Sequence, residues 1–141
     1  MYPTLTKAPT GITGFDQVTG GGLPEGRTTL VCGGTGCGKT LFAMEFLIRG
    51  ITQFDEPGVF IAFEETREEL TQNFSSLGFD LENLSAQNKL LIDHIHTDWD
   101  RMDQTGEFDL DALLIRLDHA IQKVQAKRVV LDTVEVLFDV L

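Results

Sequence analysis

A glycine-rich run in the first third of the chain has the residue types and spacing of a phosphate-binding loop. The pattern is a glycine, four residues and then Gly-Lys-Thr, ending at Thr40. Glycines let the backbone curl so that several N–H groups point at phosphate oxygens. Lys39 adds a compact positive charge for the β- and γ-phosphates, and the Thr40 hydroxyl suits Mg²⁺. The predicted nucleotide contacts are Gly33, Gly34, Thr35, Gly36, Cys37, Gly38, Lys39, Thr40 and Leu41.

The residues on either side of this loop predict the elements that hold it. The pattern of residues 28–32 predicts a buried strand, and the segment from Leu41 onward predicts a helix. The N-terminus of such a helix favours an anion. A strand, the loop and a helix in this order are the context that the motif requires. The sequence therefore predicts a site for a nucleoside triphosphate.

Acidic residues stand at the ends of two further apolar runs. Asp132 closes the run 127–132, as in a Walker B strand, where it would hold Mg²⁺ opposite Thr40. Glu64 and Glu65 follow the run 59–63. One of these carboxylates would orient and deprotonate an attacking water, and the other would tune it. The residues leave a second interpretation open, in which the pair is a solvated helix start whose charges suit the helix dipole.

The order of the predicted elements indicates the fold. Apolar runs at 59–63, 89–93 and 127–132 alternate with helical patterns, and Thr66 begins one of these helices with a capping box. This alternation predicts an α/β protein with a parallel sheet and right-handed crossovers. Ligands of such sheets lie beyond the carboxyl ends of the strands. The phosphate loop, the two glutamates and Asp132 all fall at that edge, so we expect them to converge on one nucleotide.

Composition narrows the class of protein. The 141 residues include 11 Lys and Arg and 22 Asp and Glu, which gives a formal net charge of −11. This acidic balance argues against a nucleic-acid-binding surface. Cys32 and Cys37 do not suggest a disulfide framework, and the sequence shows neither a secretory signal nor a membrane-length apolar run. The sequence therefore predicts a soluble, cytoplasmic, single-domain protein without a membrane partner.

Several stretches together resemble the KaiC family, within the RecA-like class of P-loop proteins. They are the phosphate loop and residues 10–16, 21–27, 63–66 and 130–133, in order over nearly the whole chain. The N-terminal ATPase domain of that family is the best match. The resemblance implies a RecA-like α/β fold, with a mostly parallel sheet and helices on both faces. It implies that residues 1–141 are the N-terminal part of a KaiC-type ATPase domain, truncated after the Walker B strand.

The resemblance also implies an activity. It implies a Mg²⁺-dependent ATPase that forms a homo-hexamer with ATP between subunits. Glu64 would be the general base, Glu65 its partner, Lys39 a catalytic cation and Ser76 a further nucleotide contact. For the complete protein it implies serine/threonine autokinase activity and KaiA-like, KaiB-like or signalling partners. An isolated fragment of 141 residues is expected to be unstable and inactive.

Two other functions stay open at this stage. A DNA-dependent recombinase or helicase of the RecA class shares the loop and strand order, although the acidic balance and the paired glutamates oppose it. A nucleotide-gated scaffold would bind ATP and assemble without useful turnover. Two departures from the family pattern bear on the role: Cys37 stands where Thr or Ser is common, and residues 133–136 differ from the clock protein's Ser-rich continuation. The resemblance therefore covers a circadian role and a related signalling role alike.

Overall fold

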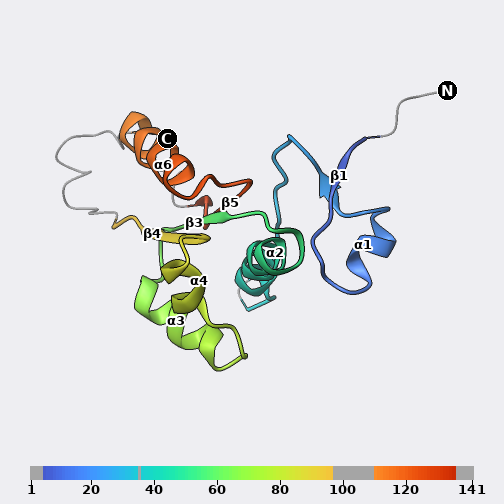
Figure 1. Ribbon diagram of the computed structural model, residues 1–141, viewed down its shortest axis with the longest axis horizontal. Coiled ribbons are helices and arrows are strands. Elements are labelled where there is room, and N and C mark those ends of the chain that lie inside the picture. The colour runs from blue at the N-terminus through green and yellow to red at the C-terminus, as the bar shows by residue number, and fades with distance from the viewer. Residues whose placement is uncertain (1–4, 35, 97–109, 136–141) are drawn as a thin grey trace.

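Three parallel strands form the centre of the fold (Figure 1). The computed structural model describes residues 5–34, 36–96 and 110–135. Within them the sheet has the order β4-β3-β5, and all neighbours are parallel. The strands are β3 (Gly58–Ala62), β4 (Leu90–His94) and β5 (Arg128–Asp132). The predicted parallel sheet is confirmed, and each strand begins or ends within one residue of its predicted position.

The central strand β3 is buried along its whole length. Its continuous apolar sequence suits a parallel strand that is covered on both faces. The pairing continues beyond the strand ends, because the Phe63 N–H donates to the Asp132 carbonyl at 2.9 Å and the Ile95 N–H donates to the Ala62 carbonyl at 2.9 Å. The carboxyl ends of the three strands therefore stay aligned at the edge where the acidic residues follow.

Three of the described helices cover one face of the sheet: α2 (Lys39–Phe54), α3 (Arg67–Ser75) and α4 (Leu81–Ala86). Buried side chains from all three meet the sheet in one cluster. The helix predicted after the phosphate loop is confirmed as α2. The short helix α4 was not predicted, although Asp80 caps it by accepting from the Asn83 N–H at 3.0 Å. The cluster includes Met44, Leu47, Phe60, Leu70, Phe74 and Leu81.

The opposite face of the sheet is covered by α6 (Leu110–Val124) (Figure 1). Its buried residues Leu113, Ala120 and Val124 pack in a cluster with Val59 and Ile61 of β3. Helices on both faces are thus confirmed. In the described part of the chain, no helix combines the length and apolarity that a membrane crossing needs.

The capping box that begins α3 is confirmed. The Thr66 hydroxyl accepts from the Glu69 N–H at 3.2 Å, and it also donates to the Glu69 carboxylate at 3.1 Å. The predicted buried face of this helix is only partly correct. Leu70 and Phe74 are buried, but Leu77 is 57% exposed, because the helix ends at Ser75 and the chain turns before Leu77.

A small N-terminal unit precedes the phosphate loop. It consists of β1 (Lys7–Ala8), α1 (Phe15–Val18) and β2 (Leu23–Pro24), and the two strands pair antiparallel. The Asp16 carboxylate accepts from the Thr10 hydroxyl at 2.6 Å and from the N–H groups of Thr10 and Gly11. These bonds close the loop between β1 and α1. These bonds give Asp16, at the end of the stretch 10–16, a structural role.

The strand predicted at 28–32 is absent from the structure. These residues have no regular structure, and Leu30 is 67% exposed and Val31 45% exposed. A strand is held by hydrogen bonds to a neighbouring strand and by cover on its faces. Among the described residues no strand pairs with 28–32. The apolar pattern indicated a buried strand, but the partner that such a strand needs is a non-local feature.

Candidate active site

A hydrogen bond joins the start of α2 to the end of β5. The Thr40 hydroxyl donates to Oδ2 of Asp132 over 2.7 Å, although 92 residues separate the two in sequence. The other carboxylate oxygen of Asp132 accepts from the Thr133 hydroxyl at 2.8 Å. Thr40 and Asp132 are both half-buried. The two residues predicted to hold Mg²⁺ therefore lie next to each other and present oxygen atoms, which this ion prefers.

The phosphate loop folds back toward its own beginning. The Lys39 ammonium donates to the Gly33 carbonyl at 2.5 Å. A Cβ at Gly33 would meet the Cys37 sulfur, so a side chain there would require that sulfur to move. Gly38, with φ of +94°, leads into α2, and no described side chain caps that helix. The first N–H groups of α2 are thus free to bind an anion. Thr35 lies outside the described residues.

The glutamate pair follows β3 at the same edge. The bond between Phe63 N–H and the Asp132 carbonyl brings Glu64 and Glu65 beside the end of β5. Glu64 is exposed, whereas Glu65 is half-buried and accepts from the Asn73 amide at 3.3 Å. Burial raises the pKa of Glu65 above 4.5, and the Asn73 bond opposes this shift. Repulsion from Asp132 and from its acidic sequence neighbours raises that pKa further, so Glu65 and Asp132 act on each other electrostatically.

The remaining predicted contacts lie in different places. Leu41, in the first turn of α2, is exposed beside the loop. Ser76 follows the last residue of α3, and its hydroxyl donates to the Asn73 carbonyl at 2.6 Å. The role of Ser76 as a nucleotide contact stays a prediction. The structure thus brings together the ends of β3 and β5 and the start of α2.

Two residues of interest were not found from the sequence. Asn73 of α3 donates to the Glu65 carboxylate across eight residues, a spacing that belongs to no recognised pattern. Arg128 is 3% exposed and lies between the sheet and α2. A basic residue at the start of an apolar strand gave no chemical pattern. Gly50, inside the apolar helix α2, lies against Arg128, but only the structure shows that the two residues are neighbours.

Comparison with known proteins decides the family. A family model described as "ATPase: KaiC" matches residues 8–140. The chain belongs to the KaiC ATPase family. Its fold is therefore of the RecA-like P-loop type, as predicted, and the described parallel sheet is part of that fold.

Curated relatives in the KaiC family cover nearly the whole chain. This chain is 57% identical over 135 residues to the "Circadian clock protein KaiC2" of Synechocystis sp. (strain ATCC 27184 / PCC 6803 / Kazusa). The alignment covers 96% of this chain and 24% of the relative. The chain is 48% identical to the "Circadian clock oscillator protein KaiC" of Prochlorococcus marinus (strain MIT 9313), covering 95% and 27%. The corresponding protein of Thermostichus vulcanus is 49% identical, covering 95% and 26%. The chain thus spans about a quarter of the length of these KaiC relatives.

Membership of a KaiC-type ATPase family implies that the chain binds a nucleotide. The family match covers the phosphate loop, the glutamate pair and Asp132 together. Which side chains contact the nucleotide and the metal ion stays a prediction for each residue.

Proposed function

We propose that this chain is the nucleotide-binding part of a Mg²⁺-dependent ATPase of the KaiC type. The observation that carries the proposal is the 2.7 Å bond between Thr40 and Asp132. It sets a Walker A hydroxyl and a Walker B carboxylate at one point, as a metal ion between phosphates and protein requires. Lys39 belongs to the same loop, one residue before Thr40. The family supports ATP as the nucleotide.

The donor set fits Mg²⁺. Thr40 and Asp132 offer hard oxygen atoms, and this ion is usually held by one or two such groups together with water and phosphate oxygens. When bound, the ion would neutralise charge on the β- and γ-phosphates. The chain's own part is to hold those phosphates. Lys39 would pair with the β- and γ-phosphates, while backbone N–H groups of residues 33–41 surround them.

The two glutamates would divide the work on the attacking water. We assign Glu64 as the general base and Glu65 as its partner. Glu64 is exposed beside the end of β5, where water can reach it. Burial and repulsion from Asp132 raise the pKa of Glu65 and favour proton uptake, whereas the Asn73 bond holds the carboxylate and opposes this shift. A water between Glu64 and the γ-phosphate would be oriented and deprotonated by Glu64 as it attacks.

Substitution of Lys39 tests the proposed site. Lys39→Ala removes the charge that faces the phosphates, so we expect ATP affinity to fall at least tenfold, the loss that about 1.4 kcal/mol represents. Isothermal titration with Mg-ATP on the full-length protein measures it. Lys123→Ala removes an exposed lysine from α6 and is the matched control. Equal affinity of Lys39→Ala and wild type would reject the nucleotide site.

The proposal for the complete protein rests on the family. It comprises a cytoplasmic homo-hexamer with ATP between subunits, serine/threonine autokinase activity, and KaiA-like, KaiB-like or signalling partners. The two curated KaiC proteins and the KaiC2 protein carry names that refer to the circadian clock. Light scattering with and without ATP tests the assembly. Incorporation of labelled phosphate into the protein tests the autokinase.

The net charge of −11 opposes the DNA-dependent alternative. An ATPase rate that rises on adding DNA would favour that alternative instead. The scaffold alternative predicts ATP-dependent assembly without turnover, so steady-state phosphate release distinguishes it from the ATPase.

A further inference from the structure

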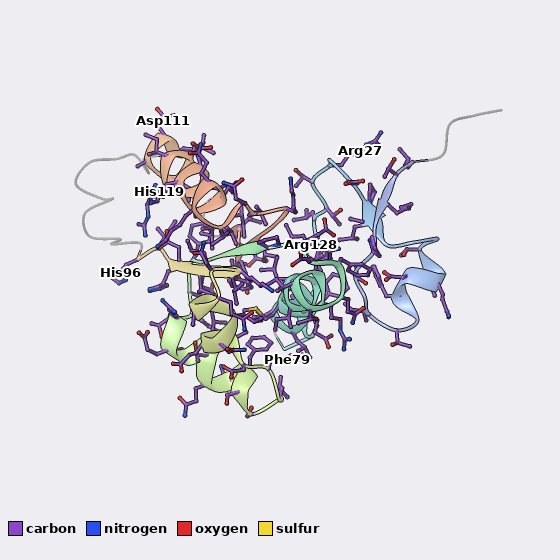
Figure 2. All side chains as sticks on the ribbon, in the orientation of Figure 1. Arg27, Phe79, His96, Asp111, His119 and Arg128 are labelled. Carbon is purple, nitrogen blue, oxygen red and sulfur yellow. The ribbon has the colours of Figure 1, made fainter. Side chains whose placement is uncertain are left out.

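Arg128 is a buried cation outside the nucleotide site. It opens β5, at the opposite end of the strand from Asp132. Only 3% of it is exposed, and Figure 2 shows it between the sheet and α2. A buried charge is costly unless it is paired and hydrogen-bonded. The way in which Arg128 is paired is therefore informative.

The guanidinium of Arg128 joins three separate segments. Nη1 donates to the Phe46 carbonyl of α2 at 3.1 Å. Nη2 donates to the Pro9 carbonyl of the N-terminal unit at 2.6 Å and to the Glu56 carboxylate at 2.9 Å. The same group lies over the Phe46 ring, 4.6 Å from its centroid. Arg128 thus attaches α2 and the N-terminal unit to the start of β5.

Helix α2 is shaped to receive this guanidinium. The residue beside it on the helix is Gly50, where a Cβ would lie 2.5 Å from both Cδ and Nε of Arg128. Glycine inside a helix costs about 1 kcal/mol relative to alanine. The chain accepts that cost at a place where any side chain would displace the guanidinium.

These contacts and the Thr40–Asp132 bond hold α2 against β5 at two points. From Arg128 to Asp132 the strand advances about 13 Å at about 3.3 Å per residue. From Thr40 to Phe46 and on to Gly50 the helix advances about 9 to 15 Å at 1.5 Å per residue. The strand and the helix thus advance by similar distances. The contacts of Arg128 at one end of β5 therefore determine which residue of α2 meets Asp132 at the other end. A slip of one helical residue would move Thr40 by about 1.5 Å.

We propose that Arg128 is a positioning residue for the Mg-ATP site, because it fixes the register of α2 along β5 and thereby sets Thr40 opposite Asp132. This assignment rests on the proposed function. Arg128 touches neither nucleotide nor metal ion in it. Its effect passes through the rigid helix to the oxygen atoms that hold Mg²⁺.

The test is the Mg²⁺ dependence of ATP binding by the full-length protein. Arg128→Lys keeps the charge but cannot reach the carbonyls of Pro9 and Phe46 and the Glu56 carboxylate with one planar fork. We expect the Mg²⁺ concentration for half-saturation, measured with a fluorescent ATP analogue, to rise about 10- to 100-fold, because a misplacement of about 1 Å caused by a distant substitution can have an effect of up to this size. Binding of the analogue in EDTA is expected to stay at the wild-type value.

Two further variants keep the test decisive. Gly50→Ala retains the arginine but pushes it aside, and we expect it to raise the half-saturating Mg²⁺ concentration as well. It carries the test if Arg128→Lys does not fold. Val124→Ala lowers stability from the opposite face of the sheet and is the matched control. We expect it to lower the melting temperature and to leave the Mg²⁺ dependence unchanged.

The possible results separate the two proposals. If Arg128→Lys and Gly50→Ala lower the melting temperature but keep the wild-type Mg²⁺ dependence, Arg128 only stabilises the fold and the assignment is overturned alone. If wild-type protein binds no ATP with Mg²⁺, the proposed function is overturned and this assignment with it. A raised Mg²⁺ requirement in both variants but not in Val124→Ala supports the assignment.

Discussion

At the scale of single residues, the two adjacent glutamates differ in their surroundings. Glu64 is exposed, whereas Glu65 is half-buried, bonded to Asn73 and repelled by Asp132. Two neighbouring carboxylates with different environments can take different parts in one reaction. Substitutions at the two positions are therefore expected to have different consequences.

Glu64→Gln removes the proposed general base and retains the size of the side chain. We expect ATP binding to persist and the rate of phosphate release by the full-length protein to fall about 10²- to 10⁴-fold, the usual contribution of a general base. Glu68→Gln, an exposed carboxylate in the first turn of α3, is the control. An unchanged rate in Glu64→Gln would show that another group activates the water.

Glu65→Gln tests the raised pKa of Glu65. Because its pKa in the folded protein lies above 4.5, the folded state binds this proton more tightly than the unfolded state does. Protonation of Glu65 therefore stabilises the folded state fully below pH 4.5, and this stabilisation is lost as the pH rises through the pKa of Glu65 in the folded protein. We therefore expect Glu65→Gln to be more stable than wild type at pH 7.

The stability difference for Glu65→Gln is expected to shrink as the pH falls toward 4.5. Urea unfolding at a series of pH values measures it, with Glu68→Gln as the comparison. A Glu65→Gln protein less stable than wild type at pH 7 would contradict the direction of the shift. A more stable variant with reduced turnover would indicate that the site retains a repulsive carboxylate for its chemistry.

At the scale of elements, α3 carries Asn73 and begins with a defined cap. The Thr66 hydroxyl accepts from the Glu69 N–H, so Thr66→Ala leaves that group without its partner. We expect a loss of about 0.5 to 2 kcal/mol in the free energy of unfolding, the usual cost of deleting such a cap. Chemical denaturation measures it. Gln72→Ala, on the same helix and exposed, is expected to change stability little.

Elements that depend on local pattern were predictable from the sequence. The apolar run of β3 and the capping box of α3 both specify their elements within a few residues. The segment 28–32 also has a strand-like sequence of Thr, Leu, Val and Cys, yet it forms no strand in the described structure. The difference is that a strand requires partners from elsewhere in the chain, and the pattern of one segment does not contain them.

The candidate site was predictable to the same extent. Its motif residues Thr40 and Asp132 were predicted to converge, and the structure confirms that they meet. Asn73 and Arg128 were missed, because neither lies in a recognised pattern, and the contacts of Arg128 also join distant segments. Patterns that evolved for chemistry are short and fixed, whereas the residues that support them can come from any neighbouring element.

At the scale of the whole molecule, apolar surface remains exposed around residues 28–32 and at Val129 of β5. An outer strand edge with apolar neighbours favours association between chains. We expect a chain of these 141 residues, expressed alone, to self-associate and to bind a hydrophobic dye. Size-exclusion chromatography with light scattering measures it. Val31→Lys is expected to reduce both effects, and a monomer with a sharp, cooperative melt would contradict the prediction.

The close approach of Arg128 to Gly50 also limits the order in which this sequence can change. Any side chain at position 50 would displace the Arg128 side chain, so substitution at position 50 is costly while position 128 is unchanged. A shorter residue at position 128 removes the obstacle first. In a laboratory selection that starts from this chain, we expect substitutions at position 50 to be recovered mainly in lineages that have already replaced Arg128. The pair would thus favour one order of mutational steps, with position 128 changing before position 50.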